Sequence, residues 1–463
     1  MALAVRELPY HPNTAARFGA IAGQPWSAWL DSGYPWTSGR WDILVCAPRR
    51  TLITRGIHTE IREDGRRVQS REDPLTLLQE NLGPQQPSHP QLPFIGGGLG
   101  WLAYDLGRRF ERLPNSARDR QHLPEMAVGI YDWALLVDHE QQQTWLVGQA
   151  ERSPAARDQL LHIAQRPVPT QSGHFRVWGP VHSNLSDADY ADRFQRIQAY
   201  IRAGDCYQVN LTRRFSVQAQ GDPWPVYLAL RQRNPAPFSG FLHSPPLFVL
   251  SASPERFLRV RNGRVDTWPI KGTRPRSQDP VQDQILRDQL ANSPKDRAEN
   301  LMILDLLRND LGRTCAIGSV RVPQRFAVQS FADVHHLVSQ VCGQLRPDQH
   351  PLDMLRGCFP GGSITGAPKI RAMEIIEDLE GERRSLYCGS LGYWGFDGTM
   401  DTNILIRTLV YARGQLSYWA GGGIVADSVL SSEATELALK ARALGEVVER
   451  FRRNQSSSSG TKD

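Results

Sequence analysis

Hydrophobic residues recur at helical spacing near the middle of the chain. Between Ser186 and Gly204, apolar residues occupy every third or fourth position: Tyr190, Phe194, Ile197 and Ile201. Ser186 and Asp189 have the spacing of a capping box, and Gly204 is typical of a helix end. The pattern predicts a helix from Ser186 to Gly204, followed by a strand through Tyr207, Val209 and Leu211.

Strand-like and helical patterns alternate irregularly in the second half of the chain. Apolar runs at 248–253, 404–410 and 416–420 predict strands, and the periodicity predicts helices over 294–311 and 432–452. This order lacks the regular βαβ repeat of a doubly wound fold. We therefore expect a mixed α+β fold.

Proline-rich and polar stretches mark the expected loops. Residues 84–93 hold too many prolines for a helix or a central strand, and residues 166–173 form a second weak joint. The last ten residues have the composition of a disordered tail. We divide the chain into an N-terminal region (1–170), a second region (180–453) and the tail (454–463).

The composition, with 40% hydrophobic and 22% charged residues, is that of a globular protein. The first residues lack a basic stretch followed by an apolar run, and no run is long enough to cross a membrane. We expect a cytoplasmic protein without a membrane partner. The cysteines lack zinc-ligand or disulfide-framework spacing and are expected to be reduced and mostly buried: Cys46, Cys206, Cys315, Cys342, Cys358 and Cys388.

The net charge of +6 raises the alternative of a nucleic-acid-binding protein built on a degenerate enzyme fold. The arginines are interleaved with acidic residues, which favours an ordinary solvated surface and no nucleic-acid partner. Lysine, by contrast, is scarce: the chain has five, at Lys271, Lys295, Lys369, Lys440 and Lys462. A lysine retained among so many arginines is a candidate for chemistry that a guanidinium cannot perform, such as nucleophilic attack by a neutral amine.

Two predicted helices each begin with a pair of acidic residues on one face. Asp296 and Glu299 are three residues apart, and so are Glu433 and Glu436. Oxygen-only clusters of this kind suit Mg²⁺, because water and an anionic substrate can complete the coordination shell of the ion. For either pair alone, the simpler interpretation is that acids favour the first turn of any helix. Only a reason for the two helices to meet favours a metal site.

Lys271 follows an apolar approach and precedes Gly272, which would let a ligand come close to the backbone. Burial there would lower the pKa of the amine. An exposed turn lysine is the alternative. Glu255, sixteen residues upstream, is a candidate general acid for a leaving hydroxyl, although a lone glutamate is more often a surface residue.

Three glycine-rich stretches invite comparison with nucleotide-binding loops. Residues 98–103 follow a proline-rich loop rather than a strand, and residues 361–369 depart from the P-loop pattern. The stretch 421–428 leads toward the second acidic helix. Its bare N–H groups could hold a substrate carboxylate.

Together, these segments resemble the family of chorismate-utilising enzymes. The resemblance covers residues 251–443 and runs through Ser-Pro-Glu-Arg-Phe at 253, Pro-Ile-Lys-Gly-Thr at 269, the acidic helix at 295–313, His-His-Leu-Val-Ser at 335, Phe-Pro-Gly-Gly-Ser-Ile-Thr-Gly-Ala-Pro-Lys at 359, Tyr-Cys-Gly-Ser-Leu-Gly-Tyr at 387 and Ile-Arg-Thr at 406. The implied fold is a sandwich of two antiparallel β-sheets with flanking helices, to which the N-terminal region also contributes.

The resemblance also implies the roles of individual residues. Glu299 and Glu436 would bind Mg²⁺, with Asp296 and Glu433 beside them, and this gives the two helices a reason to meet. The ion would hold the ring carboxylate of chorismate. The remaining pocket would bind the rest of the substrate through Tyr393, Arg407, Gly422, Gly423, Gly272, Thr273, His336, Ser363 and Lys440.

Lys271 distinguishes the branches of this family. The resemblance implies alanine at this position in anthranilate- and isochorismate-forming enzymes and lysine in the aminodeoxychorismate-forming branch. Lys271 would then attack the ring while Glu255 protonates the departing hydroxyl, and ammonia would displace the lysine to give 4-amino-4-deoxychorismate for 4-aminobenzoate and folate synthesis. Ammonia would come from glutamine through a separate glutaminase, because the chain lacks the G-x-C-x-G nucleophile motif. Component I of anthranilate synthase is the alternative.

Overall fold

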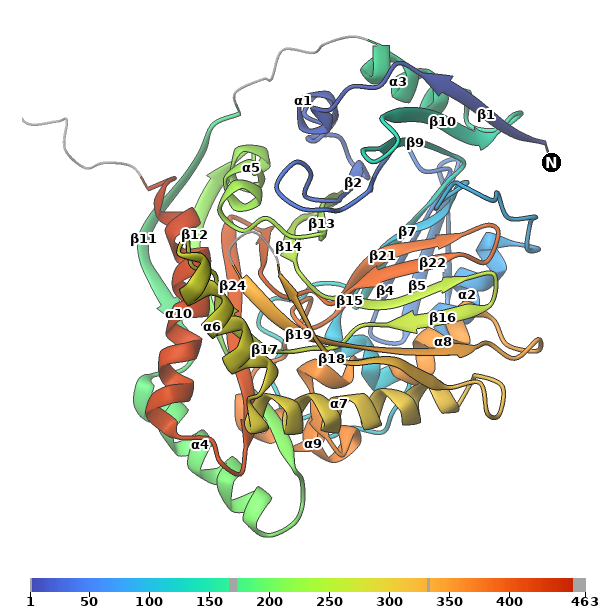
Figure 1. Cartoon of the computed structure of the whole chain (residues 1–463). Helices are drawn as coiled ribbons and strands as arrows, with labels where there is room; N and C mark the ends of the chain where they lie inside the picture. The colour runs from blue at the N-terminus through green and yellow to red at the C-terminus, as the bar shows by residue number, and fades with distance from the viewer. Residues whose placement is uncertain (1, 166–172, 331–333, 453–463) are drawn as a thin grey trace, which may run out of the picture.

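The computed structural model describes residues 2–165, 173–330 and 334–452, and its strands form two large antiparallel sheets (Figure 1). The predicted α+β sandwich is therefore confirmed. The weak joint at 166–173, except for its last residue, and the tail at 454–463 lie outside the described residues. No helix within the described ranges is both long and apolar enough to cross a membrane.

The first sheet contains twelve of the described strands. In spatial order it comprises β1 (Leu3–Leu8), β10 (Gln143–Gln149), β9 (Trp133–Asp138), β3 (Trp41–Val45), β2 (Ala28–Asp31), β13 (Phe238–Ser244), β14 (Leu247–Ser253), β23 (Thr408–Ala412), β24 (Gln415–Val425), β12 (Gln208–Gly221) and β11 (Phe175–Ser183), with β20 (Gly366–Ala367) paired to β12.

The second sheet also contains twelve of the described strands. It comprises β17 (Ile270–Pro275), β19 (Val334–Gln344), β16 (Arg264–Thr267), β15 (Arg256–Arg261), β22 (Met400–Asn403), β21 (Ser390–Gly395), β7 (Gly97–Leu102), β8 (Met126–Tyr131), β4 (Arg50–Arg55), β5 (His58–Glu63) and β6 (Arg66–Ser70), with β18 (Arg321–Ser330) paired to β19. Each sheet thus joins one block of strands from β1–β10 to another block from β11–β24.

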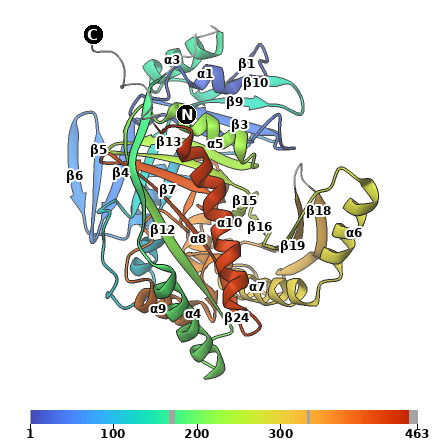
Figure 2. The same cartoon turned by 90° about the vertical axis from the view of Figure 1, so that its left-hand side faces the viewer.

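Helices cover the outer faces of the sandwich, as Figures 1 and 2 show. Those over the first sheet are α1 (Thr14–Phe18), α3 (Pro154–Gln165), α4 (Asp187–Arg202), α5 (Trp224–Arg233), α9 (Lys369–Glu380) and α10 (Leu430–Glu449). Those beside the second sheet are α2 (Pro74–Leu82), α6 (Pro280–Ala291), α7 (Pro294–Gly312) and α8 (Pro351–Cys358), and two short 3₁₀ segments lie at Tyr104–Arg109 and Gly362–Ile364.

The local sequence patterns explain where several elements begin and end. Ser186 and Asp189 form the predicted capping box, and the helix ends at Arg202, just before Gly204. Residues 84–93 contain neither helix nor strand, as predicted. The strand predicted over 404–410 begins only at Thr408, because Arg407 adopts a left-handed backbone with φ +50°. The last helix ends at Glu449 rather than 452, because Arg452 forms a bridge with Val177.

Aromatic packing closes the core beneath the first sheet. Trp29 is fully buried and contacts the rings of Phe18, Trp224 and Tyr227 at centroid distances of 5.9, 6.1 and 5.9 Å. Such clusters bury large apolar areas and add ring–ring attraction. The cluster ties α1 and α5 to β2 and so joins the N-terminal strands to the rest of the sheet.

We expect Trp29→Ala to lower the free energy of unfolding by about 3–5 kcal/mol, because it opens a cavity in a closely packed core. Trp178→Ala is the matched control: Trp178 lies in β11 with 44% of its surface exposed. The control should change stability by less than about 1 kcal/mol. Urea unfolding followed by circular dichroism measures both, and equal effects would contradict the assigned core.

Candidate active site

A bulge in an edge strand presents Lys271. The pairing of β17 with β19 shifts register between Ile270 and Thr273, which places Lys271 and Gly272 at the irregularity. Gly272 has φ +82°, and a Cβ added there would lie 2.9 Å from Cβ and Cγ of Asp296. Only glycine therefore lets the strand pass so close to the start of α7.

The amine of Lys271 is enclosed by polar groups. Its Nζ donates a hydrogen bond to the carbonyl oxygen of Ser363 at 3.4 Å. Burial lowers the pKa of Lys271, whereas the nearby charges of Glu299 and Glu255 oppose this effect. The environment thus favours the neutral amine, the form that can act as a nucleophile.

Glu255 lies on the other side of Ser363. The Ser363 hydroxyl donates to Oε1 of Glu255 at 2.6 Å, so one residue contacts both the amine and the carboxyl group. Glu255 is 8% exposed. Burial raises its pKa, while the Ser363 hydrogen bond and the charge of Lys271 counteract the rise. A carboxyl group with a raised pKa holds its proton more readily and can act as a general acid.

The two acidic helix starts meet near this amine. The charges of Glu299 and Glu436 both stabilise the ammonium form of Lys271. Burial raises the pKa of Glu299, and the charges of Asp296 and Glu433 raise it further. The pairs on α7 and α10 therefore face one common region.

Each of these carboxylates already has a protein partner. Arg274 donates to Asp296 at 2.9 Å, and Lys295 lies 3.9 Å from Glu299. Ser428 donates to Glu433 at 2.7 Å, and Lys440 pairs with Glu436 at 2.6 Å. Burial alone would raise the pKa of Glu436, but the Lys440 ammonium brings it below its ordinary value.

The chemistry of the donors fits a divalent cation held by few protein groups. No set of three His, Cys, Asp or Glu side chains within the described residues is close enough to form a complete metal site. The four carboxylates nevertheless offer only oxygen donors, and the charges of Asp296 and Glu433 add to burial in raising the pKa of Glu299. Mg²⁺ commonly binds one or two carboxylates and takes its other ligands from water and substrate.

A neutral histidine and a free guanidinium complete the opposite side. His336 accepts or donates a hydrogen bond with Thr273 at 2.9 Å between Nδ1 and Oγ1. Burial, together with the charge of Arg407, lowers the pKa of His336 to about 4. Arg407 forms no ion pair with any described residue. Its side chain is exposed to solvent, and partial desolvation by its neighbours lowers its pKa. An unpaired guanidinium suits a carboxylate ligand.

The glycine segment of β24 runs along the acidic helix α10. A Cβ on Gly422 would lie 3.4 Å from Oε2 of Glu433 and 3.9 Å from Oε1 of Glu436. Lys440 donates to the carbonyl oxygen of Gly421 at 3.0 Å. The bare backbone of Gly422 therefore borders the carboxylates directly, whereas that of Gly423 faces Gln208 and Asn210.

Comparison with known proteins agrees with this arrangement. Residues 27–446 match the family model of chorismate binding enzymes. The chain belongs to this family. It is 50% identical over 440 residues to aminodeoxychorismate synthase component 1 of Klebsiella aerogenes, covering 94% of this chain and 96% of that protein. It is 48% identical to the Escherichia coli protein of the same name, covering 90% and 92% of the two chains.

Proteins of this family that carry another name, anthranilate synthase component 1, are also similar to this chain. Anthranilate synthase component 1 of Thermus thermophilus is 41% identical, with 92% of both proteins covered. The crystal structure of anthranilate synthase component I from Streptococcus pneumoniae is 31% identical and superposes with a TM-score of 0.79, covering 88% of this chain and 92% of that one. The fold is thus shared among chorismate-binding enzymes with different names.

One residue expected in the chorismate-binding site lies elsewhere. The pairing of β21 with β7 and β22 directs Tyr393 into a separate cavity of about 550 Å³ between the sheets. There its ring lies 5.1 Å from that of Phe94, near Arg256 and Asp401. The structure therefore does not bring Tyr393 to Lys271, whereas Gly272, Thr273, His336, Ser363 and Lys440 all contact members of the site.

Two features of the site did not emerge from the sequence. Gln208 is fully buried, donates to Asn210 at 3.3 Å, and its Oε1 has no hydrogen-bond partner in the described part of the chain. Asn210 in turn donates to the Ser363 carbonyl at 3.4 Å. Cys388, next to Tyr387, is also close to the site. Burial is the main cause of its raised thiol pKa, and the charge of Glu255 adds to the rise.

We expect Glu299→Gln to lower the pKa of Lys271 further, because Glu299 is the strongest of the charges that stabilise the ammonium form. The pH dependence of Lys271 acetylation by acetic anhydride, measured by peptide mass spectrometry, should shift to lower pH. Glu374→Gln, which removes an acid paired with Arg371 outside the site, should leave the midpoint unchanged. A shift to higher pH in Glu299→Gln would contradict the geometry.

Proposed function

We propose that this chain is the synthase component of an aminodeoxychorismate synthase, a transferase that converts chorismate and ammonia to 4-amino-4-deoxychorismate. The observation that carries the proposal is the contact of Ser363 with both the Lys271 amine and the Glu255 carboxyl group. The 50% and 48% identities to proteins of that name support it. The product would supply 4-aminobenzoate and folate synthesis.

The proposed reaction uses Lys271 as a covalent nucleophile. Its neutral amine attacks carbon 2 of the ring, the double bonds shift, and the carbon 4 hydroxyl leaves as water with a proton from Glu255. Ammonia then attacks carbon 4, the double bonds shift back, and the lysine leaves as the free amine. The unpaired Oε1 of Gln208 is available to an N–H group of the incoming ammonia. The enolpyruvyl group stays on the ring throughout.

The charged groups orient the substrate. Arg407, which forms no ion pair with a described residue, would bind the enolpyruvyl carboxylate beside the Gly422 and Gly423 backbone. Glu299 and Glu436 would hold Mg²⁺, with Asp296 and Glu433 beside them. The bound ion would supply positive charge to the ring carboxylate and to the charge that develops during substitution.

A separate glutaminase would supply the ammonia from glutamine. The name component 1 of the related proteins is consistent with a second subunit, and this chain lacks a glutaminase nucleophile motif. The six cysteines are all free and buried, which suits a reducing compartment, so we place the reaction in the cytoplasm.

The same fold and metal-ligand set would also serve component I of anthranilate synthase, which adds ammonia at carbon 2 and releases pyruvate. The identities of 41% to the Thermus protein and 31% to the Streptococcus structure favour keeping this alternative. Lys271 argues against it, since its amine occupies the position from which carbon 2 would otherwise be attacked.

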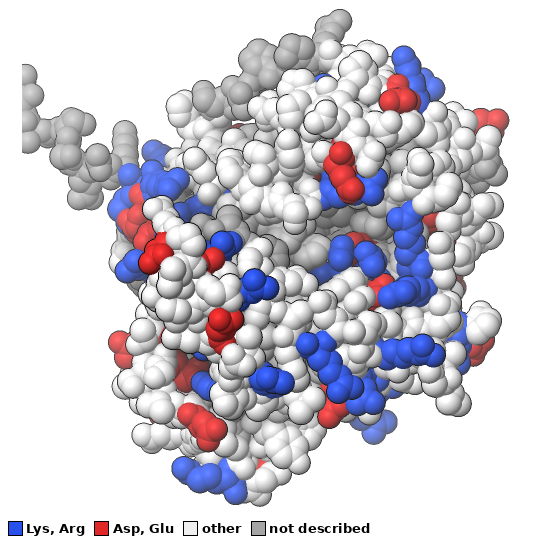
Figure 3. Space-filling view, in the orientation of Figure 1, with Lys and Arg blue, Asp and Glu red and all other residues white. Residues whose placement is uncertain are grey.

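A nucleic-acid-binding role finds little support. Figure 3 shows basic side chains gathered beside a hollow with acidic ones among them. The arginines that line the cavity around Tyr393 include Arg40, Arg256 and Arg259, and each pairs with an aspartate: Asp138, Asp401 and Asp266. Paired arginines offer less charge to phosphate.

The function is tested by product analysis with Lys271→Ala alongside the unchanged chain. With chorismate, Mg²⁺ and ammonia, mass spectrometry should detect aminodeoxychorismate from the unchanged chain and an adduct on the Lys271 peptide. Lys271→Ala should form no adduct and lose at least about 100-fold in rate, the contribution expected of covalent catalysis by a positioned group. Anthranilate as the product of the unchanged chain would refute the proposal, as would full activity in Lys271→Ala.

We expect Glu436→Gln to raise the Mg²⁺ concentration for half-maximal activity by about 10- to 100-fold, because a neutral amide is a poorer ligand for a hard cation. Glu446→Gln is the control, since Glu446 lies on the same helix and pairs with Arg233. A titration of activity against Mg²⁺ measures the change. An unchanged midpoint in Glu436→Gln would remove Glu436 from the metal site.

A further inference from the structure

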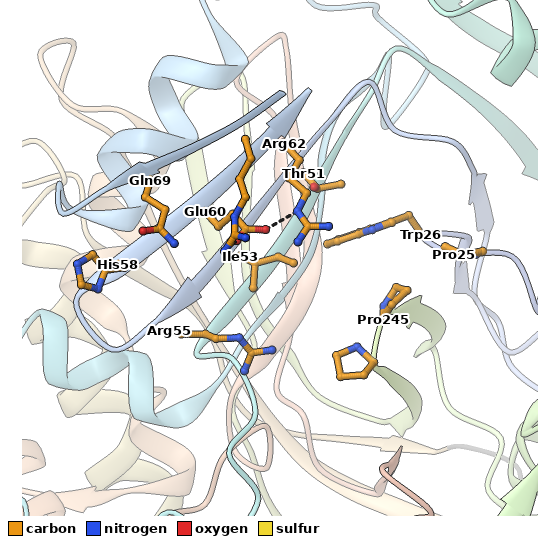
Figure 4. Close-up of a pocket in the computed structure, with 12 residues that line it drawn as sticks. Pro25, Trp26, Thr51, Ile53, Arg55, His58, Glu60, Arg62, Gln69 and Pro245 are labelled. Carbon is orange, nitrogen blue, oxygen red and sulfur yellow. Dashed lines mark hydrogen bonds and ion pairs between the residues drawn. The ribbon is translucent and has the colours of Figure 1, made fainter. Parts of the chain in front are cut away.

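A second cavity, of about 590 Å³, opens between the sheets away from Lys271 (Figure 4). One wall is formed by β4, β5 and β6 of the second sheet. The other consists of Pro25 and Trp26, before β2, and of Pro245 and Pro246, in the turn between β13 and β14. None of the residues lining it belongs to the proposed active site. The volume is in the range of small-molecule sites.

The strand wall reverses the pattern expected inside a sandwich. Cross-strand pairing aligns Thr51 with Arg62, Ile53 with Glu60, and Arg55 with His58, so these six side chains share one face. Arg67 and Gln69 continue that face on β6. The opposite face carries the buried Leu52. Polar side chains therefore point toward the first sheet at a position where packing alone would favour apolar ones.

The Trp26 ring is held in this cavity by a strained backbone. Trp26 has φ +64°, a conformation that bulky residues rarely adopt. Its N–H donates to the His243 carbonyl at 2.6 Å, and its carbonyl accepts from the Tyr131 hydroxyl at 2.8 Å. In Figure 4 the ring extends toward the strand wall, with Pro245 below it. Strain maintained by two specific contacts is characteristic of binding positions.

The cavity carries an excess of positive charge. Its lining contains three arginines and one glutamate. Glu60 pairs with both Arg62 and Arg67. Arg55 donates only to the His122 carbonyl at 3.2 Å and forms no ion pair with another described residue. Burial and the charge of Arg413 lower the pKa of Arg55, whereas the charges of Glu125, Glu60 and Asp119 oppose this effect. The Arg55 residue is exposed, and an anion beside it would give its guanidinium an ion-pair partner.

We propose that this cavity binds a small planar carboxylate, with its ring between Trp26 and the two prolines and its carboxylate on Arg55. The rigid proline and indole surfaces form an apolar slot that a phosphate would not use. The guanidinium of Arg55 and the neighbouring His58 offer donors at the rim. Arg55 is the one arginine of this lining without an ion pair among the described residues, which fits a ligand with one carboxylate better than an extended acidic peptide.

Titration calorimetry of the full chain with benzoate tests the proposal. We expect saturable binding that weakens by about tenfold or more in Arg55→Gln, as is typical when a charged hydrogen bond is lost. Benzamide, the uncharged isostere, should not bind measurably. Crystals soaked with 4-iodobenzoate should show the anomalous iodine signal between Trp26 and Pro245.

Two control variants separate this site from others. Arg413→Gln removes a neighbouring cation that does not line the cavity, and its affinity for benzoate should change by less than about threefold. Arg407→Gln removes the free guanidinium of the proposed active site and should leave the affinity unchanged. The proposal is overturned by an absence of saturable binding, by loss of binding in Arg407→Gln but not Arg55→Gln, by iodine located elsewhere, or by binding of a poly-aspartate peptide in place of benzoate.

Discussion

The proposed chemistry depends on keeping the Lys271 amine desolvated while carboxylates remain within electrostatic reach. Burial alone would favour the neutral amine, and the charges of Glu299 and Glu255 limit that effect. The bulge in β17 places Lys271 in this environment, since Gly272 brings the strand against Asp296 at the start of α7. An amine placed there can alternate between neutral and charged forms without a large change in its surroundings.

The distribution of lysine follows from the same balance. Of the five lysines, Lys271, Lys295 and Lys440 all contact or influence the acidic groups on α7 and α10. Lys369 instead forms a buried pair with Asp310 at 2.6 Å, so scarcity alone does not identify a reacting lysine. A compact ammonium can neutralise a crowded carboxylate and still be displaced, whereas a guanidinium tends to form rigid bidentate pairs.

Local patterns predicted much of the fold, because caps and periodicity act within a few residues. The capping box of α4, the proline at the start of α7 and the acidic first turns were all visible in the sequence. The strand order was not, since each sheet pairs strands that lie far apart in the sequence, such as β2 with β13 and β7 with β21. The position of Tyr393 depends on long-range pairing in the same way: its motif contains two tyrosines, and only the pairing of β21 decides that Tyr393 faces the cavity between the sheets. The effect of the Arg407 charge on His336 likewise depends on two distant segments.

Basic side chains neutralise the acidic cluster on α7 and α10. Lys440 neutralises Glu436, and Arg274 neutralises Asp296. Under the proposed function, a divalent cation at Glu436 would compete with the Lys440 ammonium, which also donates to the Gly421 carbonyl. That second bond would hold Lys440 beside the glycine segment. Its positive charge would then add to that of Arg407 at the proposed site of the substrate carboxylate, and metal and substrate would reinforce each other's binding.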